Sequence, residues 1–202
     1  FDQQIFFYAK FSKPFTHTIV TDTIINTRGL PHVRCKALLN FAPTKDGDQV
    51  LVKVGVSAVD YAGAQKNVEQ EMPDFAFDET RRAAREKWNA YLSKIDVPFS
   101  SDRDDLVKFY TALYHTAISP NLFTDVDGRY LGMDRKVKQG DVNRPVYTIF
   151  SIWDTFRALH PLLAMIDPEK NDDYLRSLLL KANEGGVLPM WDLAGNYTGT
   201  MI

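Results

Sequence analysis

Two hydrophobic patterns follow one another along this 202-residue chain. In segment 49–59 (QVLVKVGVSAV) apolar and other positions alternate, with valines at 50, 52, 54 and 56 on one face. Alternation of this kind predicts a β-strand with one buried face. After residue 60 the apolar positions recur about every 3.6 residues, which is typical of amphipathic helices. The chain is therefore expected to form strands first and helices afterwards.

Two more segments in the first part of the chain are strand candidates. Residues 5–11 (IFFYAKF) and 33–42 (VRCKALLNFA) are rich in aromatic and branched side chains. The stretch TKDGDQ that follows contains Asp46-Gly47, which tolerates positive φ and indicates a hairpin turn between two of the strands. Cys35 falls in one strand, where we expect a small core residue. Several strands with turns between them favour a β-sandwich, because two or three strands alone are marginally stable.

Helices are predicted over 78–95 and 100–119. Asp78 is the expected N-cap of the first, since an aspartate there can accept a hydrogen bond from the first turn. Ser101 and Asp104 resemble a capping box at the start of the second. The apolar stripes of these helices comprise Ala84, Trp88, Tyr91, Leu92 and Ile95 in the first, and Leu106, Phe109, Tyr110, Leu113 and Ala117 in the second.

Two further helical segments are expected near the end of the chain. Asp167 and Pro168 suit the N-cap and first position of a helix that runs to Gly185-Gly186. The preceding stretch 148–162 (TIFSIWDTFRALHPL) is mostly apolar and is also expected to be helical.

Composition narrows the class of protein. The chain is 45% hydrophobic and 25% charged, with a net charge of −2, as is typical of soluble globular proteins. Lys and Arg are scattered, so nucleic acid is not an expected partner. No apolar run approaches the roughly 20 residues of a membrane-spanning helix. One cysteine leaves no disulfide framework and no CxxC site within the chain. The chain starts with Phe1 and shows no signal peptide, so we expect an internal piece of a longer polypeptide.

Metal-binding patterns are weak in this sequence. Asp125, Asp127 and Gly128 resemble the opening of a calcium loop, but an EF-hand needs an acidic residue at loop position 12, where Lys136 stands. A structured turn is the better interpretation. Cys35 would be a nucleophile only with a histidine partner that the sequence does not place. No HxxxH or HExxH spacing, which a zinc site would favour, occurs among the histidines, which are His17, His32, His115 and His160.

The stretch 148–162 carries two charges, Asp154 and Arg157, within apolar surroundings. A buried carboxylate there would need a partner, and a helix would bring Arg157 close enough for an ion pair. Alternatively, Asp154 points into a cavity beside Trp153, an arrangement that suits a sugar, because hydroxyls donate to the carboxylate and the C–H face packs on the indole. The segment LPMWDLAGN repeats this theme with Trp191, Asp192 and Asn196 on a loop, where binding residues often collect.

Several long motifs resemble glycoside hydrolase family 92, the calcium-dependent exo-acting α-mannosidases. They are LYHTAISPNLFTDVDGRYLGMD, YTIFSIWDTFRALHPLLAMIDPE and GGVLPMWDLAGN. The segment DFAFDETRRAAREKWNAYLSKIDV is similar to the linker helices of that family. The resemblance runs over nearly all of the chain.

The resemblance implies a mixed fold in three parts. Residues 1–60 would be the last strands of an antiparallel N-terminal β-sandwich, 61–100 a helical linker, and 101–202 the first helices of an (α/α)6 barrel. It also implies an exported bacterial enzyme that acts on mannose-containing glycans, most of all α-1,2-linked ones, with inversion and calcium assistance. The remainder of the same polypeptide would be its structural partner.

Site residues follow from the resemblance position by position. The Asp of the family's WDT motif falls on Asp154, which would bind mannose, and the Trp before AGN falls on Trp191, a wall of the same subsite. Trp153, Arg157 and Asn196 would support them. The family usually has Glu after GN, whereas this chain has Tyr197. The catalytic acid, the base and the calcium ligands belong to motifs further downstream, and no residue here matches them.

Two other interpretations remain open. The protein could be a non-catalytic carbohydrate-binding or scaffold protein of the same architecture, which the Tyr197 departure allows. Alternatively, the Asp154–Arg157 pair and both tryptophans could be purely structural.

Overall fold

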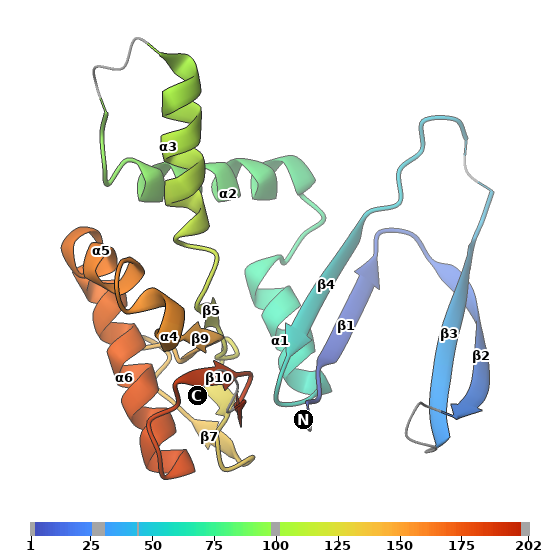
Figure 1. Ribbon diagram of the computed structural model, residues 1–202. Helices are drawn as coiled ribbons and strands as arrows, with labels where there is room; N and C mark the ends of the chain where they lie inside the picture. The colour runs from blue at the N-terminus through green and yellow to red at the C-terminus, as the bar shows by residue number, and fades with distance from the viewer. Residues whose placement is uncertain (1–2, 26–30, 44, 98–101, 199–202) are drawn as a thin grey trace. The chain divides into compact units, whose positions relative to one another are not determined.

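A computed structural model of the chain describes residues 3–25, 31–43, 45–97 and 102–198 (Figure 1). Its helices are α1 (Tyr61–Glu71), α2 (Phe77–Leu92), α3 (Arg103–His115), α4 (Ile152–Thr155), α5 (Leu159–Ile166) and α6 (Pro168–Gly185). Its strands are β1 (Phe6–Phe11), β2 (Phe15–Ile25), β3 (Pro31–Phe41), β4 (Val52–Ser57), β5 (Asn121–Leu122), β6 (Arg129–Leu131), β7 (Val137–Gln139), β8 (Tyr147–Thr148), β9 (Phe150–Ser151), β10 (Trp191–Leu193) and β11 (Asn196–Tyr197). The predicted order of strands followed by helices is confirmed, with short strands added between the later helices.

The described chain divides into two compact units. One comprises Ala9–Lys53, and the other comprises Phe1–Tyr8 with Val54–Ile202. The first unit is built on the antiparallel pair β2–β3, whose register runs from Phe15↔Phe41 to Ile25↔Pro31. Phe11 adds to it, with its ring centroid 5.0 Å from that of Phe15 and 5.7 Å from that of Phe41.

Two predictions for the strands are wrong. Gly47 does occupy a turn, with φ +83°, but β3 pairs with β2 while β4 pairs with β1, so the turn joins no hairpin. Strand pairing is decided by partners distant in sequence, which a local turn signal does not contain. Cys35 is exposed on β3 and is not a core residue.

Strand β4 shows the predicted alternation, with its small and polar positions buried. Lys53, Gly55 and Ser57 are buried, whereas Val54 is 47% exposed and its valine neighbours are exposed as well. Helix α1 explains this choice, because it packs so closely that a Cβ at Gly55 would clash with the carbonyl of Ala64. Only glycine permits that approach of helix to strand.

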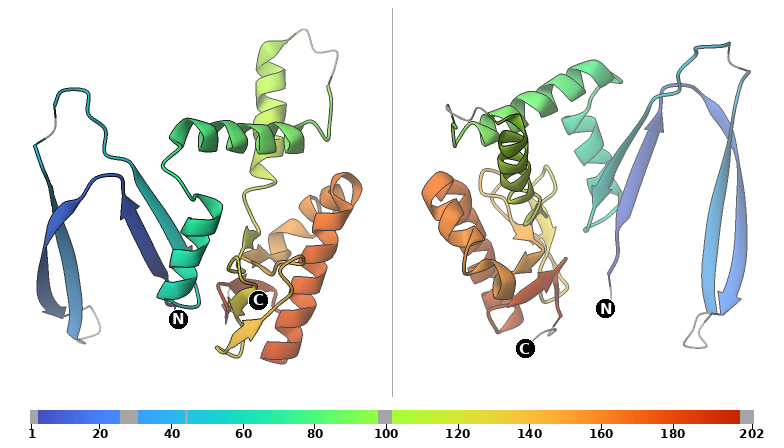
Figure 2. Two further views of the ribbon diagram at one scale, coloured as in Figure 1. Left: turned by 180° about the vertical axis from the view of Figure 1, so that it is seen from behind. Right: turned by 45° about the horizontal axis from the view of Figure 1, so that its top comes forward.

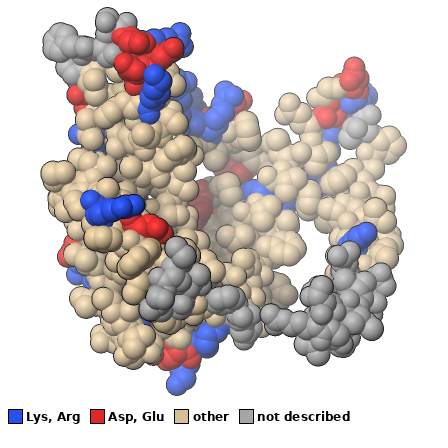
Figure 3. Space-filling view, in the orientation of Figure 1, with Lys and Arg blue, Asp and Glu red and all other residues tan. Residues whose placement is uncertain are grey.

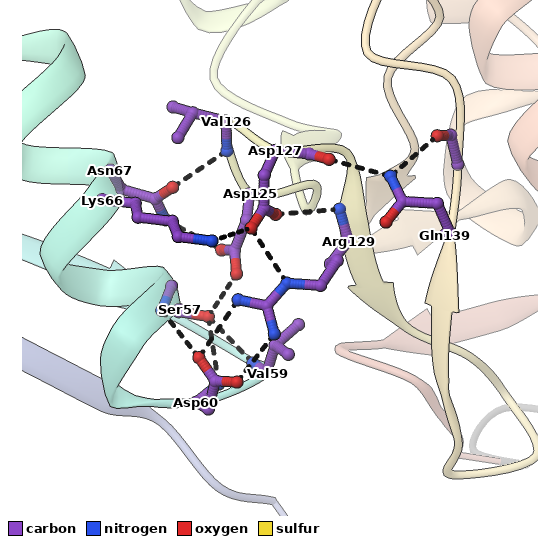
Figure 4. Close-up of polar contacts among 12 residues, drawn as sticks. Ser57, Val59, Asp60, Lys66, Asn67, Asp125, Val126, Asp127, Arg129 and Gln139 are labelled. Carbon is purple, nitrogen blue, oxygen red and sulfur yellow. Dashed lines mark hydrogen bonds and ion pairs between the residues drawn. The ribbon is translucent and has the colours of Figure 1, made fainter.

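A hydrogen-bond network fastens the DVDG turn to α1 and to the end of β4 (Figure 4). The carboxylate of Asp125, which is 6% exposed, accepts hydrogen bonds from Ser57 Oγ at 2.7 Å and from Asn67 Nδ2 at 2.8 Å. Asn67 Oδ1 in turn accepts from the backbone N–H of Val126 at 2.9 Å. Gly128 closes the turn at φ +85° by donating to the Asp125 carbonyl. The predicted structured turn is thus confirmed. Asp125 is buried with its hydrogen-bond partners, and the partly exposed Asp127 pairs with Lys66 at 2.9 Å.

Arg129 joins the same turn to the N-terminus of α1. Its guanidinium donates to Asp60 at 2.7 Å and to Asp127 at 3.0 Å (Figure 4). The hydrogen bonds from Arg129 lower the pKa of Asp60 to about 2. Asp60 also caps α1 by accepting from Gly63 N. One arginine therefore connects a helix cap to a turn more than sixty residues away.

The later helices follow the sequence pattern, although two start signals were misplaced. Helix α2 begins at Phe77, so Asp78 lies in its first turn and is not the N-cap. Asp102 caps α3 by accepting from Asp104 N at 2.8 Å, and Ser101 lies outside the described residues. Trp88 of α2 contacts Tyr114 of α3, with ring centroids 4.6 Å apart. The predicted helix from Pro168 to Gly185 is confirmed as α6.

The hydrophobic core lies around α6, which runs side by side with α5 (Figure 1 and Figure 2). Its buried members are Phe150, Leu163, Tyr174 and Leu178. Near the C-terminal end of α6, Glu184 accepts from Tyr130 Oη at 2.7 Å and from Met133 N at 3.0 Å. These bonds connect the β6–β7 pair to α6. Burial together with this hydrogen bond raises the pKa of the Tyr130 phenol.

Asn67 is expected to be the most sensitive position of the turn network. The substitution Asn67→Ala removes the bonds to Asp125, to Val126 and to the carbonyl of Val56, leaving buried groups unpaired. We expect the free energy of unfolding to fall by about 2–4 kcal/mol. Urea denaturation followed by circular dichroism would measure it. Gln65→Ala, at an exposed position of the same helix, is the control and should change stability by less than about 0.5 kcal/mol. Equal effects of both changes would contradict the network's importance.

Candidate functional site

A three-stranded antiparallel sheet brings the two candidate site segments together. Its order is β11-β10-β9, with Trp191 opposite Ser151 and Asp192 opposite Phe150. Ile152 N also donates to the carbonyl of Met190 at 3.0 Å. Segments 148–155 and 190–197, separated by more than thirty residues of sequence, are therefore neighbours (Figure 1).

Stretch 148–162 is not one helix, contrary to the sequence prediction. It starts with strand residues, turns through the four-residue α4, and enters α5 only at Leu159. Ile149 has φ +64°, which an α-helix does not allow. The pairing of β9 with β10 decides this conformation, and helical periodicity does not reveal it.

Asp154 lies in α4 with an exposed side chain, so it is not a buried carboxylate. Its Oδ2 accepts a hydrogen bond from Ser151 Oγ at 2.6 Å, and it forms no ion pair with Arg157. Arg157 is exposed beyond the end of α4. The intrahelical pair is therefore wrong, and Ser151, which the sequence did not single out, orients the carboxylate. Trp153, 53% exposed, lies beside it in the chain and presents an apolar surface to solvent.

The residues of the second segment have different exposures. Trp191 is half-buried, and its indole Nε1 is buried without a hydrogen-bond partner. Asn196 Nδ2 donates to the carbonyls of Leu193 and Ala194, both at 3.3 Å, and so holds the β10–β11 turn. Tyr197 is 39% exposed and pairs with Asp192 in the strand register. Asn196 thus shapes the loop, while Trp191 and Tyr197 have surface available.

The buried carboxylate of this region is Asp192, which is 1% exposed. Its Oδ2 lies 3.0 Å from Lys181 Nζ and accepts from Thr148 Oγ1 at 2.8 Å. Lys181 is 2% exposed and also lies over the ring of Phe123, 5.3 Å from its centroid. A buried ion pair is held only when its geometry is good and further hydrogen bonds assist it. Asp192 therefore anchors the sheet to α6.

Sequence reasoning missed Lys181 and Thr148. A signal for Lys181 was present: it recurs with Tyr174 and Leu178 on the core face of α6, and a cation at such a position needs an anion. Thr148 gave no signal, because its side-chain partners Asp192 and Ala194 lie 44 and 46 residues away in the sequence.

A cavity of about 440 Å³ lies near this sheet, between β4 with α1 and β5 with β8. Valine, isoleucine and leucine side chains line much of it, and it shares Thr148, Ile149 and Ala194 with the sheet. Neither Asp154 nor Trp191 borders it. Its buried polar residues Asn67 and Asp125 already bond to one another.

The described residues contain no group of three or more His, Cys, Asp or Glu side chains able to hold a metal ion. The described part of this chain therefore lacks the carboxylate cluster that a calcium ion favours. Among the helices described, none is both long and apolar enough to cross a membrane. On the described residues of the face in Figure 3, basic and acidic side chains are intermixed.

The catalytic-domain model of glycosyl hydrolase family 92 matches residues 63–202. No curated protein is significantly similar to the chain. A solved family GH92 α-mannosidase from Bacteroides thetaiotaomicron shares 34% identity at a TM-score of 0.88, over 99% of this chain and 28% of that one. The same enzyme in complex with mannoimidazole gives 33% identity and a TM-score of 0.87, over 98% and 27% of the two chains.

A second protein from the same organism, described as a family GH92 inverting mannosidase, is 28% identical. Its TM-score is 0.78, over 98% of this chain and 27% of its own. The present chain thus spans about 28% of the length of the first of these structures.

Replacing Lys181 tests whether its ion pair with Asp192 anchors the sheet to α6. Lys181→Met leaves Asp192 without its charge partner, and we expect the free energy of unfolding to fall by about 3–5 kcal/mol. The matched control is Lys108→Met on α3, where the lysine is 75% exposed and the change should cost less than about 0.5 kcal/mol. Urea denaturation of both variants measures the difference. A loss below about 1 kcal/mol for Lys181→Met would contradict the anchoring role.

Proposed function

The chain belongs to glycosyl hydrolase family 92, and on that basis we propose that the protein is an α-mannosidase. It releases mannose from the non-reducing end of α-mannosides, α-1,2-linked ones above all. The observation that carries this proposal is the identity of 34% over 99% of the chain with a family GH92 α-mannosidase. The chain contributes part of the sugar-binding pocket.

Asp154 is proposed as the mannose ligand. Its exposed carboxylate is oriented by Ser151, so the acceptor oxygens are available without any rearrangement of the core. A carboxylate accepts hydrogen bonds from sugar hydroxyls that are stronger than neutral ones, because the acceptor is charged. The exposed indole of Trp153 beside it offers a face for the C–H side of the ring.

Trp191 is proposed as the wall of the same subsite. In the strand register it lies opposite Ser151, which holds Asp154. The aromatic surface therefore comes from β10, and the acidic acceptor comes from α4, which directly follows β9. Asn196 supports the loop, and Arg157 is proposed as a supporting residue at the rim. The complex of a similar enzyme with mannoimidazole supports a mannose-shaped ligand for this family.

We propose the family architecture for the chain as well. Residues 1–60 would end an antiparallel β-sandwich, 61–100 would form the linker, and 101–202 would begin an (α/α)6 barrel. Exposed leucines on α6, Leu175 at 54% and Leu179 at 63%, support further helices packed on that face, because apolar patches of this kind usually mark contact surfaces.

Hydrolysis with inversion needs a carboxylic acid to protonate the leaving oxygen and a carboxylate to activate water. We propose that both, and the calcium ligands, come from the rest of the polypeptide, as the family resemblance implies. Calcium would act as a Lewis acid and template for the mannose hydroxyls. An exported bacterial enzyme acting on mannose-rich glycans is the corresponding biological setting.

Tyr197 favours one alternative function. The family usually carries glutamate there, and its replacement by an exposed tyrosine removes an acid from the neighbourhood of the site. A carbohydrate-binding protein of the same architecture would tolerate that change.

Asp154→Ala in the whole protein tests the ligand assignment. Loss of a charged hydrogen bond of about 1.5–3 kcal/mol corresponds to a fall in kcat/KM on the order of 10- to 100-fold. Thermal stability should hardly change, because the side chain is exposed. Asp105→Ala, an exposed aspartate on α3, is the control and should leave kinetics unaltered. Near-wild-type kinetics of Asp154→Ala would overturn the assignment.

Mannose release from an α-1,2-linked mannobiose tests the activity itself. We expect release by the whole protein with calcium, loss of release in EDTA, and recovery when calcium is restored. Activity that survives chelation would contradict only the calcium part. If the folded protein with calcium releases no mannose from any α-mannoside, the carbohydrate-binding alternative is favoured.

A further inference from the structure

Two residues other than glycine adopt left-handed backbone conformations next to the candidate site. Ile149 has φ +64° and Ala194 has φ +48°. This region is unfavourable for a residue with a Cβ, most of all for a β-branched one such as isoleucine. Such conformations persist only where the surrounding structure holds them, and they concentrate at functional sites. A specific interaction is therefore required at each position.

Thr148 provides a side-chain interaction at Ala194. It directly precedes Ile149 in the chain, and its Oγ1 accepts a hydrogen bond from the backbone N–H of Ala194 at 2.8 Å. The same hydroxyl donates to Asp192 Oδ2 at 2.8 Å, and Lys181 Nζ lies 3.0 Å from that oxygen. Thr148 is 3% exposed, so water does not compete for these bonds. The hydroxyl donates its one proton to Asp192, and its oxygen accepts the bond from Ala194 with a lone pair.

We propose that Thr148 is a positioning residue for the sugar site. Its hydroxyl holds the segment that leads from Thr148 to Ser151 in contact with the β10–β11 turn, through the bond from Ala194 N. The inference rests on the proposed function, because it concerns the same mannose-binding surface. It assigns no contact with substrate to Thr148, which acts through Asp192 and Ala194.

The strand geometry explains how a buried hydroxyl reaches an exposed site. Successive side chains of a strand point to opposite faces of the sheet. Because Asp192 points toward Lys181, Trp191 and Leu193 point to the opposite face. On the neighbouring strand, Trp191 lies opposite Ser151, whose hydroxyl holds Asp154. The position of Trp191 relative to Ser151, and so relative to Asp154, therefore depends on the Thr148–Asp192 contact.

The test compares Thr148→Val with Thr148→Ser in the whole protein. Valine keeps the shape of threonine and removes the hydroxyl, whereas serine keeps the hydroxyl and is the matched control. Mannoimidazole affinity by calorimetry, steady-state kinetics on an α-mannoside, and hydrogen exchange of the peptides covering 186–197 are the readouts. Thermal unfolding of each variant reports general stability.

We expect Thr148→Val to speed exchange within 191–197 selectively and to weaken mannoimidazole binding on the order of 10- to 100-fold, since a small displacement of a positioned group can cost that much. KM should rise more than kcat falls, because the displaced groups bind sugar. Thr148→Ser should stay within about threefold of wild type in each readout. Should Thr148→Val fail to fold, Thr148→Ala places no methyl group against the Ala194 N–H and is read in the same way.

Two results would overturn the inference. One is unchanged exchange in 191–197 for a folded variant without the hydroxyl. The other is faster exchange spread evenly over the protein with a matching fall in Tm, which would make Thr148 a general stabiliser. Wild-type protein that neither hydrolyses α-mannosides nor binds mannoimidazole would contradict the proposed function, and the exchange result would still decide the role of Thr148.

Discussion

The buried ion pair between Lys181 and Asp192 is the constraint on which the candidate site depends. Both side chains are almost fully removed from solvent, at 2% and 1% exposure, so neither charge can be left without the other. The pair joins the longest helix to the middle strand of the β11-β10-β9 sheet. Trp191 and the loop held by Asn196 extend from that strand, and Ser151, which holds Asp154, pairs with it.

A second network, also built around a buried carboxylate, connects the DVDG turn to α1 and to the end of β4. Asp125 is buried and satisfied by Ser57 and Asn67, and Arg129 connects the turn to the cap of α1. In both networks a buried acidic residue, Asp125 or Asp192, bonds to side chains of the protein and so connects separate elements of the fold. Asp154, the exposed acidic residue of the candidate site, accepts a hydrogen bond from Ser151. The buried carboxylates of Asp125 and Asp192 stabilise the scaffold, whereas the carboxylate of Asp154 is exposed.

This division suits a sugar-binding surface. Sugars are bound by groups whose positions are fixed beforehand, since ordering flexible side chains on binding costs affinity. A short sheet pinned to a core helix, with left-handed residues on either side, supplies that fixed arrangement. The chain spans about 28% of the length of a similar α-mannosidase, and we propose that it contributes only part of the sugar-binding pocket.

Much of the secondary structure follows from local sequence alone. Alternation predicted β4, and the 3.6-residue period predicted α2 and α3. The start at Asp167-Pro168 and the end at Gly185-Gly186 predicted α6, and Asp-Val-Asp-Gly predicted a turn. Each of these signals depends on residues near one another in the chain. The motifs around Asp154 and Trp191 also identified the family. Only the tertiary structure decided that β4 buries Gly55 and not its valines, that β3 pairs with β2, and that the buried carboxylate beside the candidate site is Asp192 and not Asp154. Those outcomes depend on partners tens of residues away, and no local pattern of hydrophobic and polar residues specifies which partner will be met.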